Sequence, residues 1–441
     1  MSSEWPQVRL GDLIEVRHGW PFRSELFFEE KTGEGIVVAV GNFRYTGGFR
    51  FDETATKEYR GEYPSDYKLE PGDILLVMTC QTAGGEILGI PARVPSDGRL
   101  YLHNQRLGKV VVKRTDEVLP DYLYWLFLSA SFNQALVSTA SGTKILHTSP
   151  SRICDFKFAL PPISVQREVA ATLWSLESRI DLLRQSNATL EAIAQALFKS
   201  WFVDFDPVRA KAEGRDLEGV DPETAALFSD GFEESALGLV PKGWTTGILG
   251  DLVFLRSDRT KPTAKTEALP YVPIESITSK LPFLEHCKSG TEANSSLTLF
   301  KEGDILFGAM RPYFHKVCMA PFDGVTRTTV FTLAPKYCNA AAYALFQMFQ
   351  VSTIEYATQH SEGSTIPYAK WPNSMEKMPI VRPPDVLQEA FTRIAGSLIQ
   401  RANSNIALSQ TLAGVRDNLL PRLISGQLRL AEAEAILDDA A

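Results

Sequence analysis

Two long segments of the chain carry apolar residues at alternating spacings of four and three. The first segment follows Pro161-Pro162, and its seam consists of Val169, Leu173, Leu176, Ile180, Leu183, Asn187, Leu190, Ala194, Leu197 and Trp201. The second follows Pro383-Pro384, and its seam consists of Ile394, Leu398, Arg401, Asn405, Leu408, Leu412, Val415 and Leu419. Because heptads of this kind are typical of paired helices, we expect two long helices that form an antiparallel coiled coil.

Polar residues interrupt both seams, at Asn187 and at Asn405. Buried amides at such positions fix the register of a coiled coil at some cost in stability. A helix over residues 164–201 would be about 55 Å long at about 1.5 Å per residue, more than a single domain of this size needs. Length therefore favours pairing, although two amphipathic helices packed on separate domains remain the alternative. The second seam is less regular, since Gly396, Gly414 and Arg401 lie on or near it, and its register stays open.

Outside these segments, short β-branched runs alternate with turn residues. The runs are Gly35–Val40, Asp73–Val77, Leu107–Val112 and Thr329–Leu333. Shorter helical patterns lie at 120–138 and 339–359. Together they predict α+β domains with many short strands.

Three motifs recur in the same order along the chain. WPQVRLGDL at Trp5 returns as WTTGILGDL at Trp244, an offset of 239 residues. EPGDIL at Glu70 returns as KEGDIL at Lys301 with an offset of 231, and LPPISVQ returns as RPPDVLQ with an offset of 222. An offset that only shrinks indicates two copies of one fold whose loops differ in length.

The repeat and the helices define a domain plan. We expect a first globular domain at 1–158, a helix at 159–202, an acidic connector at 203–243, a second globular domain at 244–380, and a helix with a C-terminal tail at 381–441. Pro207 is expected to end the first helix, and the connector is expected to be ordered but irregular. A connector of this length lets the helices run antiparallel, with one globular domain at each end of the rod.

The composition predicts a multidomain cytoplasmic protein without a metal site. A chain of 441 residues is too long for one ordinary domain. We find no apolar stretch of about 18 residues and no secretion signal. The five cysteines are scattered, without the spacing of metal ligands, and are expected to be reduced and structural.

The net charge of −8 is unevenly distributed. Residues 203–243 alone contribute −6, so the two globular domains are close to neutral. Binding to phosphates depends on an excess of Lys and Arg. If the chain binds DNA, we therefore expect weak binding by the chain alone and a need for partner subunits.

Catalytic motifs are missing from the sequence. There is no G-x-x-x-x-G-K-[ST] loop for ATP, no G-x-G-x-x-G, and no [DN]-P-P-[YF] of the kind found in amino-methyltransferases. We expect a non-catalytic chain. A nuclease or methyltransferase with a diverged active site, and a coiled-coil scaffold that joins two protein-binding domains, remain the other classes.

Several segments in order resemble the specificity subunit of type I restriction-modification enzymes. They are W-x4-LGDL in both halves, GDIL in both halves, LPPISVQREVAATLWSLESRIDLL, LEAIAQALFKSWFVDFDPVRAKAEG and RDNLLPRLISGQLRL. The resemblance covers nearly the whole chain. It implies that each globular half is a target recognition domain that reads one half of a split DNA sequence, while the paired helices set the gap between the halves.

The resemblance also implies partners. Two modification subunits, which bind S-adenosylmethionine and methylate adenine, would dock on the helices. Restriction subunits with ATP-driven and magnesium-dependent activity would join them, and this chain would bind no cofactor itself. A methylation-only system or another phage-defence complex with the same reader is the alternative. The residues expected on the partner-docking helices are Leu176, Ile180, Leu183, Leu190, Leu398, Leu408, Leu412 and Leu419.

Polar loop clusters are the candidates for DNA contact, because amides, hydroxyls and cations read bases and phosphates. In the first domain they are Asn42, Arg44, Tyr45, Thr79, Gln81, Asn104, Gln105, Arg106 and Lys144. In the second they are Arg311, Tyr313, His315, Lys316, Arg327, Thr328 and Ser364. Each cluster could equally be an ordinary solvated loop. Since the two domains differ in sequence, the expected target is asymmetric and interrupted, with half-sites one to one and a half helical turns apart.

Overall fold

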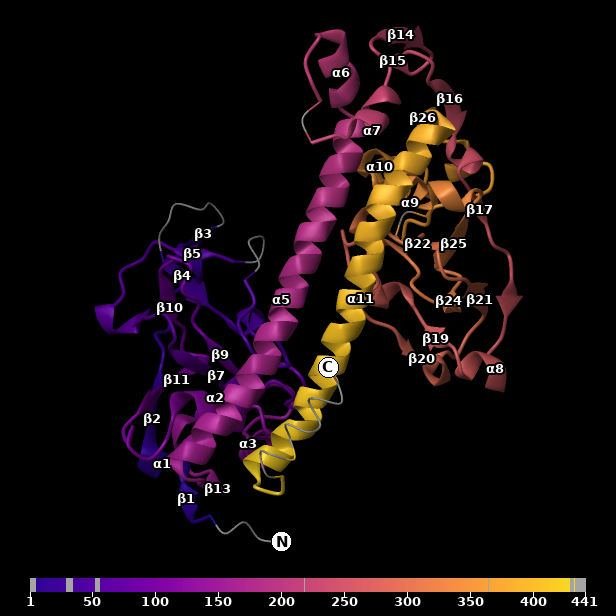
Figure 1. Ribbon diagram of the computed structural model, residues 1–441. Coiled ribbons are helices and arrows are strands. Elements are labelled where there is room, and N and C mark those ends of the chain that lie inside the picture. The colour runs from indigo at the N-terminus through magenta and orange to yellow at the C-terminus, as the bar shows by residue number, and fades with distance from the viewer. Residues whose placement is uncertain are drawn as a thin grey trace. The chain divides into compact units, whose positions relative to one another are not determined.

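The computed structural model describes residues 5–28, 35–51, 56–217, 219–363, 365–428 and 432. It divides into two compact units, residues 1–180 with 411–441 and residues 181–410. Both units mix helices with sheets, so the predicted α+β class is confirmed (Figure 1). Within the described residues, no helix has both the length and the apolar character needed to span a membrane.

Most elements of the first unit are short strands. In chain order they are β1 (Gln7–Arg9), α1 (Leu10–Leu13), β2 (Ile14–His18), β3 (Phe27–Phe28), β4 (Gly35–Val38), β5 (Glu58–Tyr59), β6 (Lys68–Leu69), β7 (Ile74–Val77), β8 (Thr79–Cys80), β9 (Pro91–Arg93), β10 (Tyr101–His103), β11 (Leu107–Val112), α2 (Pro120–Phe127), α3 (Ala130–Thr139), β12 (Leu146–His147), α4 (Pro150–Cys154) and β13 (Lys157–Ala159).

The second unit repeats this alternation. Its elements are α6 (Asp206–Ala212), α7 (Pro222–Ala226), β14 (Phe232–Ser235), β15 (Gly238–Pro241), β16 (Thr245–Ile248), β17 (Val253–Leu255), β18 (Arg259–Thr260), α8 (Ala264–Glu267), β19 (Pro270–Tyr271), β20 (Lys288–Ser289), β21 (Leu297–Phe300), β22 (Ile305–Gly308), β23 (Val317–Met319), β24 (Gly324–Arg327), β25 (Val330–Pro335), α9 (Ala341–Phe349), α10 (Val351–Gln359) and β26 (Pro379–Arg382). Two long helices, α5 (Ile163–Phe202) and α11 (Asp385–Ile424), contribute residues to both units.

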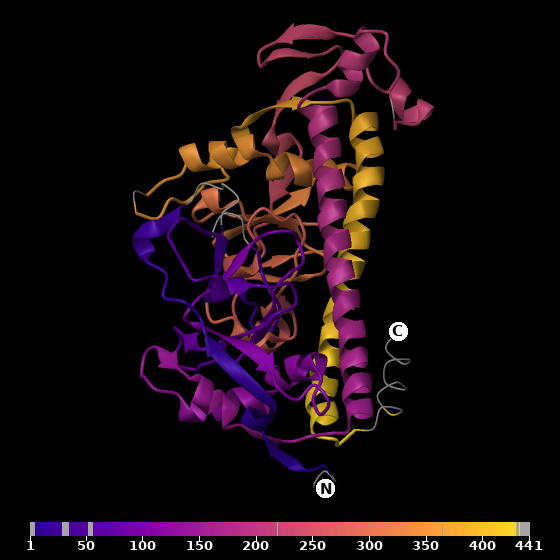
Figure 2. The same ribbon diagram turned by 90° about the vertical axis from the view of Figure 1, so that its left-hand side faces the viewer.

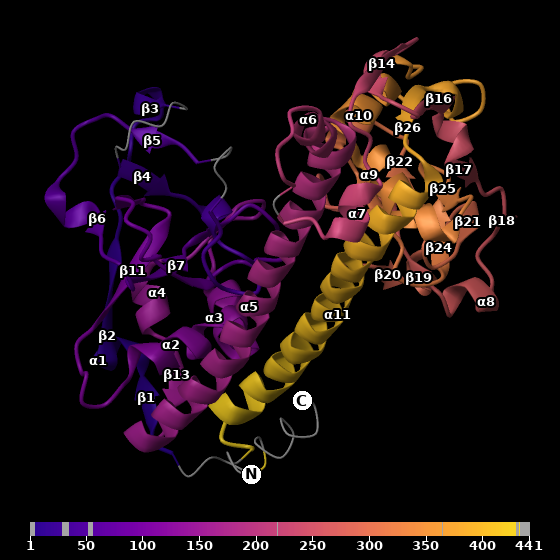
Figure 3. The same cartoon turned by 45° about the horizontal axis from the view of Figure 1, so that its top comes forward.

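The four-stranded sheets of the two units share one strand order. In the first unit a four-stranded antiparallel sheet has the order β2-β11-β7-β9, and in the second the matching strands give β17-β25-β22-β23. Figure 3 labels β2, β11 and β7 of the first sheet and β17, β25 and β22 of the second. Each unit adds a five-stranded sheet with one parallel pair, β4 with β10 and β19 with β24. A two-stranded ribbon, β1 with β13 or β16 with β26, closes each copy. The predicted internal repeat is therefore a repeat of one fold.

The repeated Gly-Asp pair forms the same turn in both copies. Gly72 and Gly303 have φ angles of 91° and 83°, in the left-handed region that favours glycine. The next residue closes the turn, because Asp73 Oδ2 accepts a hydrogen bond from the Glu70 amide and Asp304 Oδ2 accepts one from the Lys301 amide, each 2.8 Å long. The turn leads into the buried strands β7 and β22, which explains why GDIL recurs.

A buried glutamine fixes the start of each long helix. Gln166 Nε2 donates to the Pro161 carbonyl at 2.8 Å, and Gln388 Nε2 donates to the Pro383 carbonyl at 2.9 Å. Both side chains are almost fully buried, at 0% and 2% exposure. Gln166 also accepts from the Leu119 amide and donates to the Glu117 carbonyl, which ties α5 to the loop before α2. The third repeat motif therefore has a structural basis.

The two long helices pack against each other within both units, as Figure 2 shows. In the second unit Asn405 Nδ2 donates to Asn187 Oδ1 at 2.9 Å, and Phe198 packs on Phe391 with ring centroids 5.5 Å apart. Residues further along α5 contact residues that come earlier in α11, so the two helices run antiparallel, as predicted. In the first unit Arg416 of α11 forms an ion pair with Glu177 of α5, in the same direction.

The structure sets the register of the second seam. Arg401 is exposed, while its neighbour Ala402 is fully buried and its carbonyl accepts a 3.2 Å hydrogen bond from Asn187 Nδ2. Ala395 is buried in the same way. Because a straight helix drifts relative to a strict heptad, the buried stripe shifts by one residue towards these small side chains. The small side chains also let the helix backbones approach closely.

Several local predictions differ from the structure. The segments 120–138 and 339–359 each form two helices. The backbone is extended at Ser129 and at Gln350, and this interrupts the helical conformation between α2 and α3 and between α9 and α10. Helix α5 ends at Phe202, before Pro207, which lies in the first turn of α6, where a proline is tolerated. The connector is also not irregular, since it contains α6, α7 and the hairpin of β14 and β15.

Candidate nucleic-acid interface

In the first unit, four polar segments meet at one edge of the four-stranded sheet. We call this the first loop edge, and it consists of residues 42–50, 78–90, 103–106 and 141–147. It is the edge where β7 ends and where β9 and β11 begin. Backbone hydrogen bonds join the segments, from the Met78 amide to the Arg106 carbonyl at 2.9 Å and from the Gly48 amide to the Pro91 carbonyl at 3.1 Å.

A short strand pair connects two of the candidate clusters. Strand β8 pairs with β12, and Thr79 Oγ1 lies 3.1 Å from His147 Nδ1. This brings Thr79 and Gln81 next to the turn that carries Lys144. Thr79 is itself buried, whereas Gln81 and Lys144 are exposed. The exposed members are the ones that could reach a ligand.

The remaining first-domain candidates fall into two groups. Tyr45, Gln105 and Arg106 are exposed, and Arg44 and Asn104 are half-buried. Asn42 is buried. Its side-chain Oδ1 accepts a hydrogen bond from the Ala39 backbone amide, and its Nδ2 donates one to the Arg50 carbonyl. Asn42 therefore shapes the loop that presents Tyr45, which is 59% exposed.

The second unit gathers its polar segments at the matching sheet edge. We call this the second loop edge, and it consists of residues 277–281, 309–316, 327–329, 361–363 and 365–370. It is the edge where β22 ends and where β23 and β25 begin. The Arg311 amide donates to the Pro367 carbonyl at 2.7 Å, and the Ala309 amide donates to the Thr329 carbonyl at 2.9 Å. The candidate clusters around Arg311 and Arg327 are therefore neighbours.

The candidates at the second loop edge differ in accessibility. Tyr313 and Thr328 are exposed, and Arg311 and Arg327 are half-buried. His315 is buried, and burial lowers its pKa. Burial also lowers the pKa of Lys316, whose ammonium group donates to the Ile274 carbonyl at 2.8 Å. Ser364 lies outside the described residues.

Sequence reasoning missed residues that the fold brings to these edges. Lys280 joins the second loop edge through the hydrogen bond from its amide to the His315 carbonyl, 2.8 Å long. Phe314 is 47% exposed beside Tyr313, and Arg50 is exposed at the first loop edge. Lys280 had no local signal, because its proximity is purely tertiary. Phe314 and Arg50 are adjacent to predicted clusters and could have been included on that basis.

Positive charge concentrates at both edges although the chain is acidic. The segments of the second loop edge contain five Lys and Arg residues and one Glu, and those of the first contain four and one. This excess suits a polyanion, because cations that neutralise phosphates release bound counterions. The acidic connector, not the edges, accounts for most of the net charge of −8.

The apolar residues expected to dock partners on the long helices are buried or half-buried in the fold of this chain. Leu176, Ile180, Leu412 and Leu419 are buried, and Leu183, Leu190, Leu398 and Leu408 are half-buried. Leu190 and Leu398 pack against the core cluster that includes Ala194 of α5 and Ala395 of α11. Helix α5 also exposes apolar side chains on another face, Leu182 at 65% and Ile193 at 49%.

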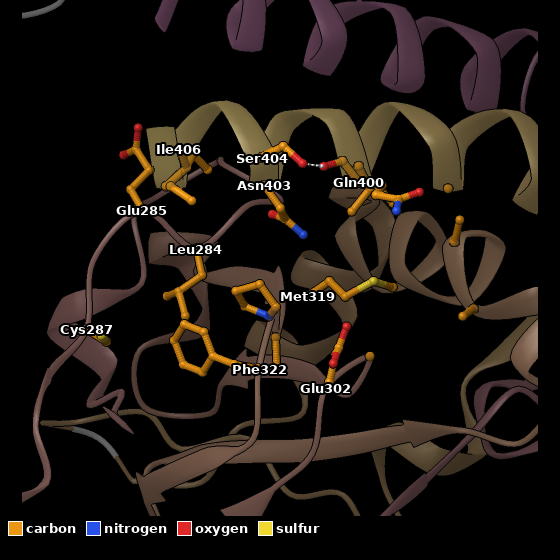
Figure 4. Close-up of a pocket in the computed structure, with 18 of the residues that line it drawn as sticks. Leu284, Glu285, Cys287, Glu302, Met319, Phe322, Gln400, Asn403, Ser404 and Ile406 are labelled. Carbon is orange, nitrogen blue, oxygen red and sulfur yellow. Dashed lines mark hydrogen bonds between the residues drawn. The ribbon is translucent and has the colours of Figure 1, made fainter. Parts of the chain in front are cut away.

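A cavity of about 620 Å³ lies in the second unit between α11 and nearby loops (Figure 4). Its walls combine Leu284, Met319 and Phe322 with the polar side chains of Glu302 and Asn403. These groups include no hydrogen-bonded nucleophile and base among the described residues. Across the same part of the chain, no cluster of three or more His, Cys, Asp or Glu side chains could hold a metal ion. We therefore place the candidate site at the loop edges.

Comparisons with known proteins point to one family. Residues 2–192 match the model of the type I restriction modification DNA specificity domain. The specificity subunit of the type I restriction enzyme MjaIX from Methanocaldococcus jannaschii is 24% identical over 347 residues, which cover 75% of this chain and 73% of that protein. The HindI specificity subunit from Haemophilus influenzae is 26% identical over 400 residues, 78% of this chain and 86% of that one.

A solved structure shares the fold. The S subunit of a type I restriction-modification system from M. genitalium aligns with a TM-score of 0.56 over 96% of both chains, at 13% identity.

Proposed function

Because the chain belongs to the family of type I restriction-modification specificity subunits, we propose that it reads a split DNA target, one half with each globular domain. The observation that carries this proposal is the pair of loop edges. They lie at the same end of matching sheets and gather polar and cationic side chains from segments far apart in sequence. Loops on a rigid sheet are the usual place for recognition residues.

The target would be asymmetric and interrupted. The two loop edges differ in sequence, with Thr79, Gln81 and Asn104 at one and Arg311, Tyr313 and Thr328 at the other, so their half-sites should differ. We assign the recognition domains to 1–158 and 244–380, the spacer helices to 159–202 and 381–441, and the connector to 203–243. The helices would set the distance between the half-sites.

Catalysis would belong to partner subunits. We propose that two methyltransferase subunits dock on the spacer helices, that restriction subunits can join them, and that S-adenosylmethionine, ATP and magnesium are bound by those partners. The exposed Leu182 and Ile193 are eleven residues apart on α5, close to three helical turns, and so share one face. That face is our candidate for docking, since the leucines first expected to dock partners are buried or half-buried.

The test is footprinting of the chain in complex with its methylating partner. Methylation mapping of DNA from cells that express both proteins supplies the target motif. We expect two protected stretches separated by an unprotected gap, and weak protection by the chain alone. A complex without sequence preference would favour a protein scaffold. Methyl transfer from labelled S-adenosylmethionine by the isolated chain would contradict the non-catalytic assignment.

A further inference from the structure

Two exposed aromatic rings form the tip of the loop between β22 and β23. Tyr313 is 49% exposed and Phe314 is 47% exposed, and their ring centroids are 4.9 Å apart at an interplanar angle of 53°. Both lie in η7 (Pro312–Phe314), a single tight turn. Contiguous exposed apolar side chains of this kind often mark an interaction site.

The backbone on both sides of this tip is held in a sparsely populated conformation. Arg311 and His315 flank the turn with φ angles of 53° and 52°, in the left-handed region that non-glycine residues seldom adopt. Lys280, with φ of 57°, donates its amide hydrogen to the His315 carbonyl at 2.8 Å. Three of the five non-glycine residues with positive φ in the described part of the chain therefore meet at this point. Strain of this kind tends to gather at binding sites.

The base of the turn is anchored while its tip is free of the core. The His315 ring is only 7% exposed and packs on Phe349 with centroids 4.5 Å apart. Pro312 is buried, and Ser279 Oγ donates a hydrogen bond to the Phe314 carbonyl. His315 Nε2 is buried without a hydrogen-bond partner among the described residues. The aromatic pair is therefore presented in a fixed position, which reduces the entropy lost on binding.

The surroundings of the tip indicate a polyanionic ligand with flat faces. Arg311 and Lys316 flank the tip within its own loop, and Lys280 lies on the loop joined to it. The second loop edge as a whole has five Lys and Arg residues against one Glu. Cations would meet phosphates while aromatic rings stack on bases. A protein partner would be a poorer match, because lysine is depleted at protein interfaces, whereas three of the five cations of this edge are lysines.

We propose that Tyr313 and Phe314 form an aromatic wedge that inserts at a base step of the half-site read by the second domain and stacks on the opened bases. The inference rests on the proposed function and goes beyond it, since it assigns local DNA distortion to one half only. Residues 78–90, the corresponding loop of the first domain, have no exposed large hydrophobic side chain among the described residues. The exposed Tyr45 and Ile145 of the first loop edge lie in two separate loops and do not form an aromatic pair. Apolar wedges of this kind unstack and kink the duplex.

The test uses the complex of the full chain with its methylating partner. The probe is a duplex that contains the methylation-mapped motif, with 2-aminopurine at successive positions of both halves, because its fluorescence rises when it is unstacked. We expect a rise at one step of one half that disappears in Tyr313→Ala/Phe314→Ala. Affinity should fall about 5- to 100-fold, as expected for the loss of base stacking. Tyr313→Phe should retain the signal.

Tyr337→Ala is the matched control. Tyr337 is 56% exposed and follows β25 at the opposite end of the same sheet, so its substitution should change neither fluorescence nor affinity. Thermal unfolding of each variant checks that the fold is intact. Wild-type affinity and fluorescence in the Tyr313→Ala/Phe314→Ala variant would overturn the wedge. Loss of the methylating partner with DNA affinity retained would also overturn it, in favour of a protein contact.

The proposed function and the aromatic wedge can fail separately. If the wild-type complex shows no preference for the mapped motif, the proposed function is wrong. If it prefers the motif but no step in either half responds to Tyr313 and Phe314, only the wedge is wrong.

Discussion

Two charged residues on the long helices, Glu191 and Arg416, are expected to affect the stability of the fold and its dependence on pH. Glu191 of α5 is half-buried near Glu285, and Arg416 of α11 is 5% exposed between Glu177 and Asp417. Ionised groups removed from water are stable only with suitable partners. Glu191 faces a like charge, whereas Arg416 faces opposite ones, so substitutions at these two sites should have opposite effects.

We expect Glu191→Gln to stabilise the protein above neutral pH. Burial, together with the charge of Glu285, raises the pKa of Glu191 from 4.5 to about 7. The folded state therefore holds this proton more tightly, and the related stability is fully present below pH 4.5 and lost as the pH rises towards 7. Urea unfolding across this range should show a flatter pH profile for Glu191→Gln. The exposed Glu168→Gln on the same helix is the control, and an unchanged profile in Glu191→Gln would contradict the assignment.

We expect Glu177→Leu to destabilise the protein by about 3 kcal/mol, because it removes one of the two carboxylates that face the buried Arg416 guanidinium. The double variant Glu177→Leu/Arg416→Met should recover most of this loss, since it removes the charge together with its partner. Unfolding free energies of both variants provide the measurement. A double variant as unstable as Glu177→Leu would show that packing, not charge, matters here.

Residue roles at the loop edges could be predicted only in part. The polar loop clusters were visible in the sequence because hydroxyl, amide and cationic side chains stand out between strands. Burial was not visible, so Asn42 and His315 were grouped with accessible residues although both lie inside the fold. Lys280 could not be found at all, since its link to His315 joins loops that are 35 residues apart.

At the scale of elements, the long helices were the most predictable part and the shortest strands the least. A heptad pattern over many turns averages out local noise, and helix α5 spans Ile163–Phe202 against an expected 164–201. Strands β8 and β12 have two residues each and exist because they pair with each other. Such pairs are set by tertiary contacts and leave no periodicity to detect.

The paired asparagines of α5 and α11 give a prediction at this scale. Asn405→Leu should cost about 1–2 kcal/mol, because Asn187 Oδ1 loses the donor it has in Asn405 Nδ2. The double variant Asn187→Leu/Asn405→Leu should regain stability but lose the constraint on helix register. A double-mutant cycle by urea unfolding measures the coupling. Additive effects of the two substitutions would mean that the amides act independently.

At the scale of the whole molecule, duplication explains both the similarity and the difference between the halves. The four-stranded sheets, the Gly-Asp turns and the buried glutamines are the same, while the loops differ in length and sequence. The shrinking offset from 239 to 222 residues located these differences in the loops. The sequence could not show which loops meet, because that depends on strand order.

Exchange of one recognition domain gives the prediction at this scale. We expect replacement of residues 1–158 by the same region of a relative to change one half of the methylated motif and to leave the other half unchanged. Methylation mapping in cells that also express the modification partner is the measurement. Replacement of 244–380 should do the converse. A change in both halves after a single exchange would refute independent reading.

The glutamine bonds at the start of each long helix have a consequence for how this protein can change over time. Gln166 and Gln388 each donate a hydrogen bond to the carbonyl of the proline five residues earlier, so the chain enters both long helices through the same kind of junction. We expect a different globular domain to be tolerated before either helix, provided that its last strand leads the chain into this junction in the same direction. We therefore expect that a single genetic crossover at this junction can exchange one globular domain while the long helix that follows keeps its start.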